Sequence, residues 1–236
     1  MPLNRYTKEY PELGTVIVTR NPRARRIVMR AHPDAIHMTI PVQATEIDIE
    51  RALLQCGQKL RQRQKGMQQN LITAGHSIGN DMFKLSITEH SGDKFLLKQN
   101  GKEFVLMCPS GTDYTDFNMQ EWLKKAISNA MTKAARSVLP QRLKELAIKH
   151  GFSYNRCSIR DVHTRWGSCS SKGNINLSIY LMLLPNELID YVLLHELCHT
   201  KEMNHSDRFW ALMDKIVSPS SAKALRAKLK SYNTTL

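Results

Sequence analysis

The sequence predicts an α+β protein with a strand-rich N-terminal portion, residues 1–112, and a mostly helical C-terminal portion, residues 113–236. β-branched or alternating apolar runs recur up to residue 108, whereas the apolar period is helical from Asn118 onward. A chain of 236 residues is long enough for one large domain or two small ones. The boundary near residue 112 therefore separates either two domains or two parts of one continuous unit.

The first 80 residues predict three strands, one helix and a loop. The strands are expected at residues 16–18, 27–29 and 36–40, where apolar residues are β-branched or alternate with polar ones. Thr45 and Asp48 have the spacing of a capping box, which predicts a helix from there to about Gln64. The polar, glycine-containing stretch at 66–80 is expected to be a loop.

Residues 82–108 predict a further hairpin. Apolar residues alternate from Phe83 to Ile87, and two apolar runs, at 95–97 and 104–106, flank Asn100-Gly101. Asn-Gly between two apolar runs is a strong signal for a tight turn between strands. A loop is expected at 109–117.

The remaining residues predict one long helix, a strand pair and three shorter helices. The long helix is expected from Asn118, its cap, to about His150, with a kink or a division at Pro140. Strands at 154–162 and 174–179 are expected on either side of a small-residue loop at 167–173. Helices are expected at 185–201, 206–217 and 221–231.

Composition favours a cytoplasmic protein with no membrane partner. The five cysteines are scattered without a CxxC pair, which fits a reducing compartment. No apolar run approaches the roughly 20 residues of a membrane span, and the polar N-terminus lacks a secretory signal. The net charge of +13 is compatible with nucleic acid as a partner or with a solvated basic surface. No feature of the sequence fixes the oligomeric state.

The segment from His195 to His199 predicts a metal site. Two histidines four residues apart on a helix project within about 40° of each other, so both imidazoles can bind one zinc ion. Glu196 lies about 100° round the helix from His195, where it can act as a general base rather than a ligand. His205 is the candidate third ligand. With nine His and eleven Glu in the chain, HExxH has a chance expectation of roughly 0.016.

Cys198 lies within the same segment and has two interpretations. A thiolate could be a fourth zinc ligand, which would make the site closed and structural. A cysteine on an apolar helix also commonly serves as a small buried hydrophobic residue.

The sequence resembles the YgjP-like metallopeptidase family, a zincin group related in its core to the SprT-like proteases. The motifs that carry the resemblance lie in order across residues 155–215. They are Arg165-Trp166-Gly167-Ser168-Cys169-Ser170, Asn174-Ile175-Asn176-Leu177, Pro185, His195-Glu196-Leu197-Cys198-His199, Asn204-His205-Ser206 and Phe209-Trp210.

The resemblance implies a zincin-like core and a zinc-dependent hydrolase acting on a peptide or protein substrate. It implies one zinc ion (Zn2+) per chain held by His195, His199 and His205, with Glu196 as the catalytic base. It also implies that the strand after Arg165-Trp166 lies beside the metal-binding helix, where zincins commonly receive extended substrate.

Further residues are candidates for contact with substrate. Arg165, Trp166 and Tyr180 are predicted to bind it, and Arg165, Tyr180 or His163 could stabilise an oxyanion. The alternative interpretations are a surface charge for Arg165, core aromatic residues for Trp166 and Tyr180, and a loop histidine for His163.

Acidic residues near the metal site have two interpretations as well. Glu202, Asp207 or Asp190 could orient a ligating imidazole, or each could be a solvated or capping acid.

Two alternatives to a general peptidase are retained. One is a nucleic-acid-associated, SprT-like protease that acts on DNA-bound protein, in which the basic charge is functional. The other is a structural-zinc protein without catalysis, which would need a fourth protein ligand.

Overall fold

The computed structural model describes residues 4–234, so the three N-terminal and two C-terminal residues lie outside the description. It is an α+β structure, as predicted, and its contacts divide it into two compact units. One unit is the chain through Thr73 together with Gly111–Leu123, and the other is Ala74–Ser110 together with the chain from Lys124 onward. No helix among the described residues is long and apolar enough to span a membrane.

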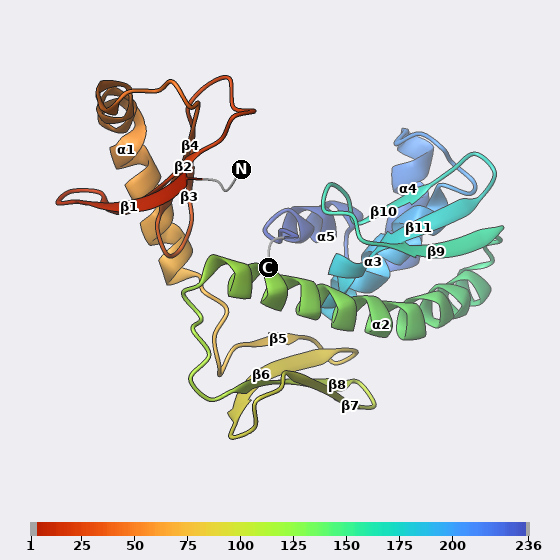
Figure 1. The fold of residues 1–236 in the computed structure, drawn as a ribbon. Coiled ribbons are helices and arrows are strands. Elements are labelled where there is room, and N and C mark those ends of the chain that lie inside the picture. Colours follow the sequence, from red (N-terminus) through yellow and green to blue (C-terminus); the bar gives the residue numbers. More distant parts are fainter. Residues whose placement is uncertain (1–3, 235–236) are drawn as a thin grey trace. The chain divides into compact units, whose positions relative to one another are not determined.

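The first unit packs one helix against a four-stranded sheet (Figure 1). Its strands are β1 (Asn4–Tyr10), β2 (Gly14–Arg20), β3 (Val28–Ala31) and β4 (Ile36–Ile40), in the order β1-β2-β4-β3. Helix α1 (Glu46–Gln69) begins at the predicted capping box, in which the Thr45 and Asp48 side chains each bind the other residue's backbone N–H. Apolar residues of β2, β4 and α1 form the core of the unit.

The sequence analysis missed two features of this unit. Strand β1 pairs with β2 along its whole length, although its sequence is too polar to show an apolar alternation. Helix α1 continues five residues beyond Gln64, into the stretch predicted as a loop.

The second unit contains a four-stranded sheet that the predicted hairpin describes only in part. Its strands are β5 (Ser77–Gly79), β6 (Lys84–His90), β7 (Leu96–Asn100) and β8 (Glu103–Pro109), in the order β5-β6-β8-β7. The turn between β7 and β8 is at Asn100-Gly101, as predicted, and Gly101 takes a φ of 57°. Strand β6, however, pairs with β8 in parallel.

Residues 74–110 group with the C-terminal helices, which differs from the boundary predicted near residue 112. A polar contact contributes to this grouping, because the Asn80 amide donates hydrogen bonds to the carbonyls of Met182 (3.1 Å) and Leu184 (2.7 Å). Such a contact between residues about a hundred positions apart has no local signature in the sequence.

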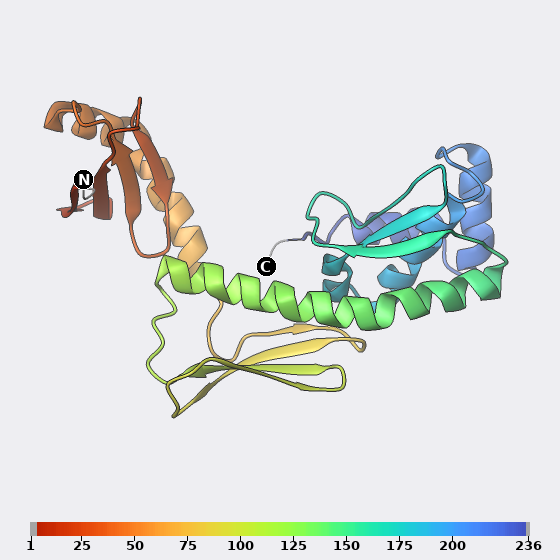
Figure 2. The same ribbon diagram turned by 45° about the vertical axis from the view of Figure 1, so that its right-hand side comes forward.

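Helix α2 (Phe117–His150) is one continuous element, so it is not divided at Pro140 (Figure 2). The prediction that Asn118 caps the helix is wrong, because Asn118 lies inside it. Asp116 takes that role instead, and its carboxylate accepts a hydrogen bond of 2.7 Å from the Met119 N–H. The helix ends before Gly151, whose φ of 67° suits the predicted stop.

The C-terminal part of this unit places a small sheet beside three helices (Figure 1). Strands β9 (Arg156–Arg160), β10 (Gly167–Cys169) and β11 (Asn174–Ser178) have the order β10-β11-β9, which leaves β10 at an edge. Strand β10 lies within the stretch that was predicted as a loop. A 3₁₀ helix (Ile179–Leu183) leads to α3 (Asn186–Cys198), α4 (Asp207–Val217) and α5 (Ala222–Leu229).

Candidate metal centre

The predicted metal site begins on α3, which is a largely buried helix. Leu188, Ile189, Leu193 and Leu197 are fully buried, so the helix is packed on more than one side. The guanidinium of Arg142, on α2, donates two hydrogen bonds to the Asp190 carboxylate, at 2.8 and 2.6 Å. This pair fixes α3 against the long helix. The helix ends at Cys198, three residues earlier than predicted, and hydrogen-bonded turns lead the chain toward His205.

The structure brings together the three predicted ligands. Each of His195, His199 and His205 offers a nitrogen, and the three nitrogens lie within 4.8 Å of one another. The Nε2 atoms of His195 and His205 are 3.0 Å apart. Ligands at 2.0–2.1 Å from a tetrahedral zinc ion are separated by about 3.3 Å, so the spacing of this pair is close to that of two ligands on one zinc ion.

The chemistry of the three imidazoles also fits a metal. Burial lowers the pKa of His195 to about 3, with further contributions from His199 and His205. Burial likewise lowers the pKa of His205. The imidazoles of His195 and His205 therefore favour the neutral form, which is the form that binds a metal.

Two contacts hold the imidazoles in place. The Nδ1 of His199 lies 3.1 Å from the main-chain carbonyl of Glu202, which leaves Nε2 for a metal. The buried ring of Phe209, on α4, lies under all three imidazoles, with centroid distances of 4.9, 4.7 and 4.8 Å to His195, His199 and His205. Sequence analysis assigned no role to this ring, because nothing local shows that α4 packs beneath the histidines.

The acids proposed to orient the ligands have other partners. Asp190 binds Arg142, and the carboxylate of Glu202 lies 3.6 Å from Nε of Arg208, so Glu202 holds His199 through its backbone only. Asp207 occupies the first turn of α4, where an acid is favourable.

Glu196 is a buried acid next to the histidines but outside their group. It is 5% exposed, and its Oε2 has no hydrogen-bond partner among the described residues. Burial raises the pKa of Glu196 to about 7, and the positive charge of Arg165 opposes that rise. A carboxyl group poised near neutral pH is suited to accept and release a proton.

Strand β10 lies directly against Glu196. A Cβ atom added at Gly167 would lie 2.7 Å from Oε1 of Glu196 and 2.8 Å from its Cγ, closer than real atoms approach. Only glycine therefore allows the strand backbone to come this near to the acid. The expected position of this strand beside α3 is confirmed.

The other predicted contact residues lie around the start of β10. Arg165 lines a cavity of about 360 Å³, and Trp166 is half-buried in the wall of a second one, of about 250 Å³. Tyr180 is buried, and its hydroxyl lies 2.7 Å from Nε2 of His163.

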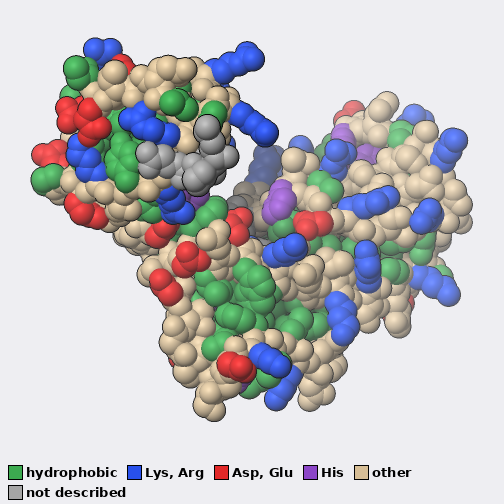
Figure 3. Space-filling view, viewed as in Figure 1, with side chains coloured by type: hydrophobic (Ala, Val, Ile, Leu, Met, Phe, Trp, Pro, Cys, Tyr) green, Lys and Arg blue, Asp and Glu red, His purple; other side chains and the backbone are tan. Residues whose placement is uncertain are grey.

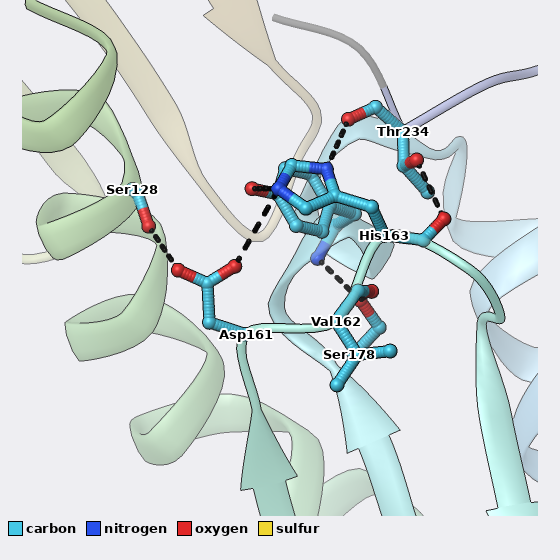
Figure 4. Close-up of polar contacts among 7 residues, drawn as sticks. Ser128, Asp161, Val162, His163, Ser178 and Thr234 are labelled. Carbon is cyan, nitrogen blue, oxygen red and sulfur yellow. Dashed lines mark hydrogen bonds and ion pairs between the residues drawn. The ribbon is translucent and has the colours of Figure 1, made fainter. Parts of the chain in front are cut away.

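Figure 4 shows the surroundings of His163, whose Nδ1 lies 3.1 Å from the Thr234 carbonyl. The Asp161 carboxylate lies close by and binds Ser128 at 2.8 Å. Tyr180 and His163 are thus engaged with each other and with the C-terminal segment. That favours the structural interpretation of both residues.

A second group of candidate ligands, His32, Asp34 and His37, lies in the first unit. The two imidazoles stack face to face, with centroids 4.1 Å apart and planes inclined by 10°. Ring nitrogens bind a metal in the plane of the ring, and one ion cannot lie in both of these nearly parallel planes. In the histidine triad, the ring plane of His199 is inclined by 86° to that of His195 and by 82° to that of His205. The triad is therefore the better zinc site.

Comparison with known proteins places these features in a family. The model of the YgjP-like, metallopeptidase domain matches residues 25–232. Two similar solved structures are those of metallopeptidase zymogens. Abylysin of Pyrococcus abyssi shares 26% identity over 40% of this chain and 93% of that chain, with a TM-score of 0.36. Jannalysin of Methanocaldococcus jannaschii shares 22% identity over 39% of this chain and 93% of that chain, with a TM-score of 0.35.

No curated protein matches the chain. The family match covers most of the sequence, including every residue of the histidine triad and Glu196. This chain belongs to the YgjP-like metallopeptidase family.

Proposed function

We propose that this protein is a zinc metallopeptidase that hydrolyses peptide bonds with Glu196 as its general base. The observation that carries the proposal is the convergence of three imidazole nitrogens within 4.8 Å beside a buried acid outside their group. Three protein ligands leave one coordination position for water or substrate, as catalytic zinc sites do. When bound, zinc would supply Lewis-acid polarisation of the scissile carbonyl and of the attacking water.

The residues of the chain supply the proton transfer and the positioning. Glu196 accepts the proton of the attacking water and passes it to the leaving amine. Strand β10 is at the edge of its sheet and lies against Glu196, so an extended peptide that pairs with it passes close to the acid. Arg165, Trp166 and Tyr180 stay predictions as substrate-binding residues.

Metal analysis combined with a proteolysis assay tests this function. Purified protein is expected to hold one zinc ion per chain and to cleave an unstructured protein such as casein. His199→Ala is expected to lose both properties, because two imidazoles hold zinc far more weakly than three. His76→Ala, a histidine outside both candidate groups, is the matched control and should keep both. Undiminished hydrolysis by protein stripped of metal would contradict the proposal.

The structural-zinc alternative is tested at Cys198. This residue is fully buried, and burial raises the pKa of its thiol to about 12. The group of candidate ligand atoms found among residues 4–234 at this site consists of the three histidines without Cys198. Cys198→Ala is therefore expected to keep one zinc ion per chain, as measured by mass spectrometry under native conditions. Loss of zinc from this variant would favour a closed, four-ligand site instead.

The charge distribution supports a second candidate, a protease that acts on DNA-bound protein. The unit that contains the triad has 22 Lys and Arg against 12 Asp and Glu, so it carries +10 of the total +13. Basic side chains are nevertheless scattered over the face seen in Figure 3. A DNA affinity that falls steeply with salt would support this candidate. The absence of binding at low salt would remove it.

We also propose a reducing compartment, the cytoplasm, as the location of the protein. None of the five cysteines, all of which lie among the described residues, forms a disulfide, which fits such a compartment. Cell fractionation that finds the protein outside the cytoplasm would contradict this location.

A further inference from the structure

A basic cavity lies on the small sheet that carries the edge strand. Its volume is about 360 Å³, and its lining includes Arg160, Arg165, Ser168, Asn176 and Ser178. Arg160 comes from the end of β9, Arg165 from the loop before β10, and the other three from β10 and β11. The lining thus includes two arginines and three neutral polar residues.

Strand register places the polar strand residues of this lining on the sheet face opposite Glu196, whereas Gly167 and Leu177, which also line the cavity, belong to the face of Glu196. Successive side chains of a strand point to opposite faces, and Gly167 faces Glu196. The next residue, Ser168, therefore belongs to the other face, together with its cross-strand partner Asn176. Ser178, two residues further along β11, is paired with Arg160 and shares this face.

Neither arginine forms an ion pair with a carboxylate among the described residues, although the charge of Arg165 acts on Glu196 at longer range. No acid among those residues lines the cavity. Arg142, in the same unit, is paired with Asp190 instead. The cavity therefore offers donors and positive charge to a ligand from outside the chain.

An extended substrate paired with β10 would present side chains to this cavity. Such a strand continues the sheet about 4.8 Å beyond β10, and its side chains alternate between the two faces. A residue whose side chain lies on the Gly167 and Glu196 face has neighbours whose side chains lie on the Ser168 face. Arg160 and Arg165 line the same cavity.

We infer that this cavity is a substrate subsite that selects a carboxylate next to the scissile bond. Guanidinium groups bind carboxylates with paired, charge-assisted hydrogen bonds, and Ser168 and Asn176 supply further polar partners. The carboxylate can belong to an Asp or Glu side chain or to the C-terminus of a peptide. This inference rests on the proposed function, because it assigns the cavity to that reaction.

Matched peptides test the subsite. Zinc-loaded protein is given peptides that differ only by Glu or Gln beside the cleaved bond, each with a free or an amidated C-terminus. A preference of about tenfold in kcat/KM for Glu over Gln identifies the side chain as the ligand. A similar loss on amidation identifies the C-terminal carboxylate. Equal rates for all four peptides would overturn the inference but leave the proposed function standing.

Three variants at two positions of β9 assign the effect to the cavity. Arg160→Gln is expected to bring the preference close to unity, and Arg160→Glu to favour a Lys peptide. Arg156→Gln is the matched control, since it removes the same charge from an exposed position on β9 outside the cavity and should keep the preference. An unchanged preference in Arg160→Gln would overturn the inference.

A binding measurement keeps the inference testable if no peptide is cleaved. Fluorescence anisotropy with the same labelled peptides reports selectivity without catalysis. Preferential binding of the carboxylate peptide that depends on Arg160 supports the subsite, even if failure to cleave removes the proposed function. Equal binding of all peptides overturns the subsite. Tighter binding of an oligonucleotide that is lost in Arg160→Gln would assign the arginines to phosphate and overturn it as well.

Discussion

Replacing Glu196 with glutamine is expected to abolish peptide hydrolysis while leaving zinc binding intact. Glutamine has nearly the same shape, so it should fit the buried space that Glu196 fills, but its amide does not accept a proton at neutral pH. Loss of a positioned general base typically costs about 10²–10⁴-fold in rate. Glu196 lies outside the group of three histidines, so the metal content should stay at one ion per chain.

The measurement is kcat for a fluorogenic peptide together with the zinc content of the same sample. Glu187→Gln is the matched control, because Glu187 lies in the first turn of the same helix and only pairs with Lys228 on the surface. That control should keep its activity within about twofold, since exposed ion pairs contribute little. A fully active Glu196→Gln enzyme would show that another group acts as the base. Loss of zinc would show that Glu196 belongs to the ligand set.

Gly167→Ala is expected to lower kcat by about 100-fold without loss of zinc. The added methyl group would lie 2.7–2.9 Å from three atoms of the Glu196 side chain. Because Glu196 is buried, its side chain has little room to move aside, so either the acid or strand β10 must shift. A displacement of about 1 Å in a reacting group can cost roughly 100-fold in rate. The three atoms nearest to this methyl group all belong to Glu196, so the three histidines proposed as ligands should keep their zinc.

Gly66→Ala provides the matched control for this substitution. A Cβ at Gly66 meets no atom within 4 Å, and its helical backbone accepts alanine. Activity of this variant should equal that of the original protein, and its Tm should be equal or slightly higher. The informative readout for Gly167→Ala is kcat with circular dichroism, which separates a displaced base from an unfolded chain. Full activity with an unchanged fold would contradict the close contact between strand and acid.

Local sequence patterns predicted the features that depend on neighbours along the chain. The spacing of His195, Glu196 and His199 is set by the pitch of one helix, and the Thr45 capping box is set by three residues. The triad follows from such patterns, because His205 lies only six residues after His199.

Contacts between distant segments were not predictable in this way. Strand β1 is polar and depends on pairing with β2. Strands β6 and β8 are neighbours in the sheet although β7 lies between them in the sequence. The approach of Gly167 to Glu196 joins residues 29 positions apart, and Phe209 reaches the histidines from another helix. These contacts depend on packing, so a single sequence does not display them.

The shortness of β10 affects how this surface can discriminate between ligands. Three residues at a sheet edge offer only a few main-chain hydrogen bonds, and main-chain bonds are the same for every extended peptide. A longer free edge would hold substrate more firmly, but it would also be a template for association between copies of the chain. An edge this short leaves discrimination to side chains, so a peptide bound there as proposed would be held weakly and exchanged quickly.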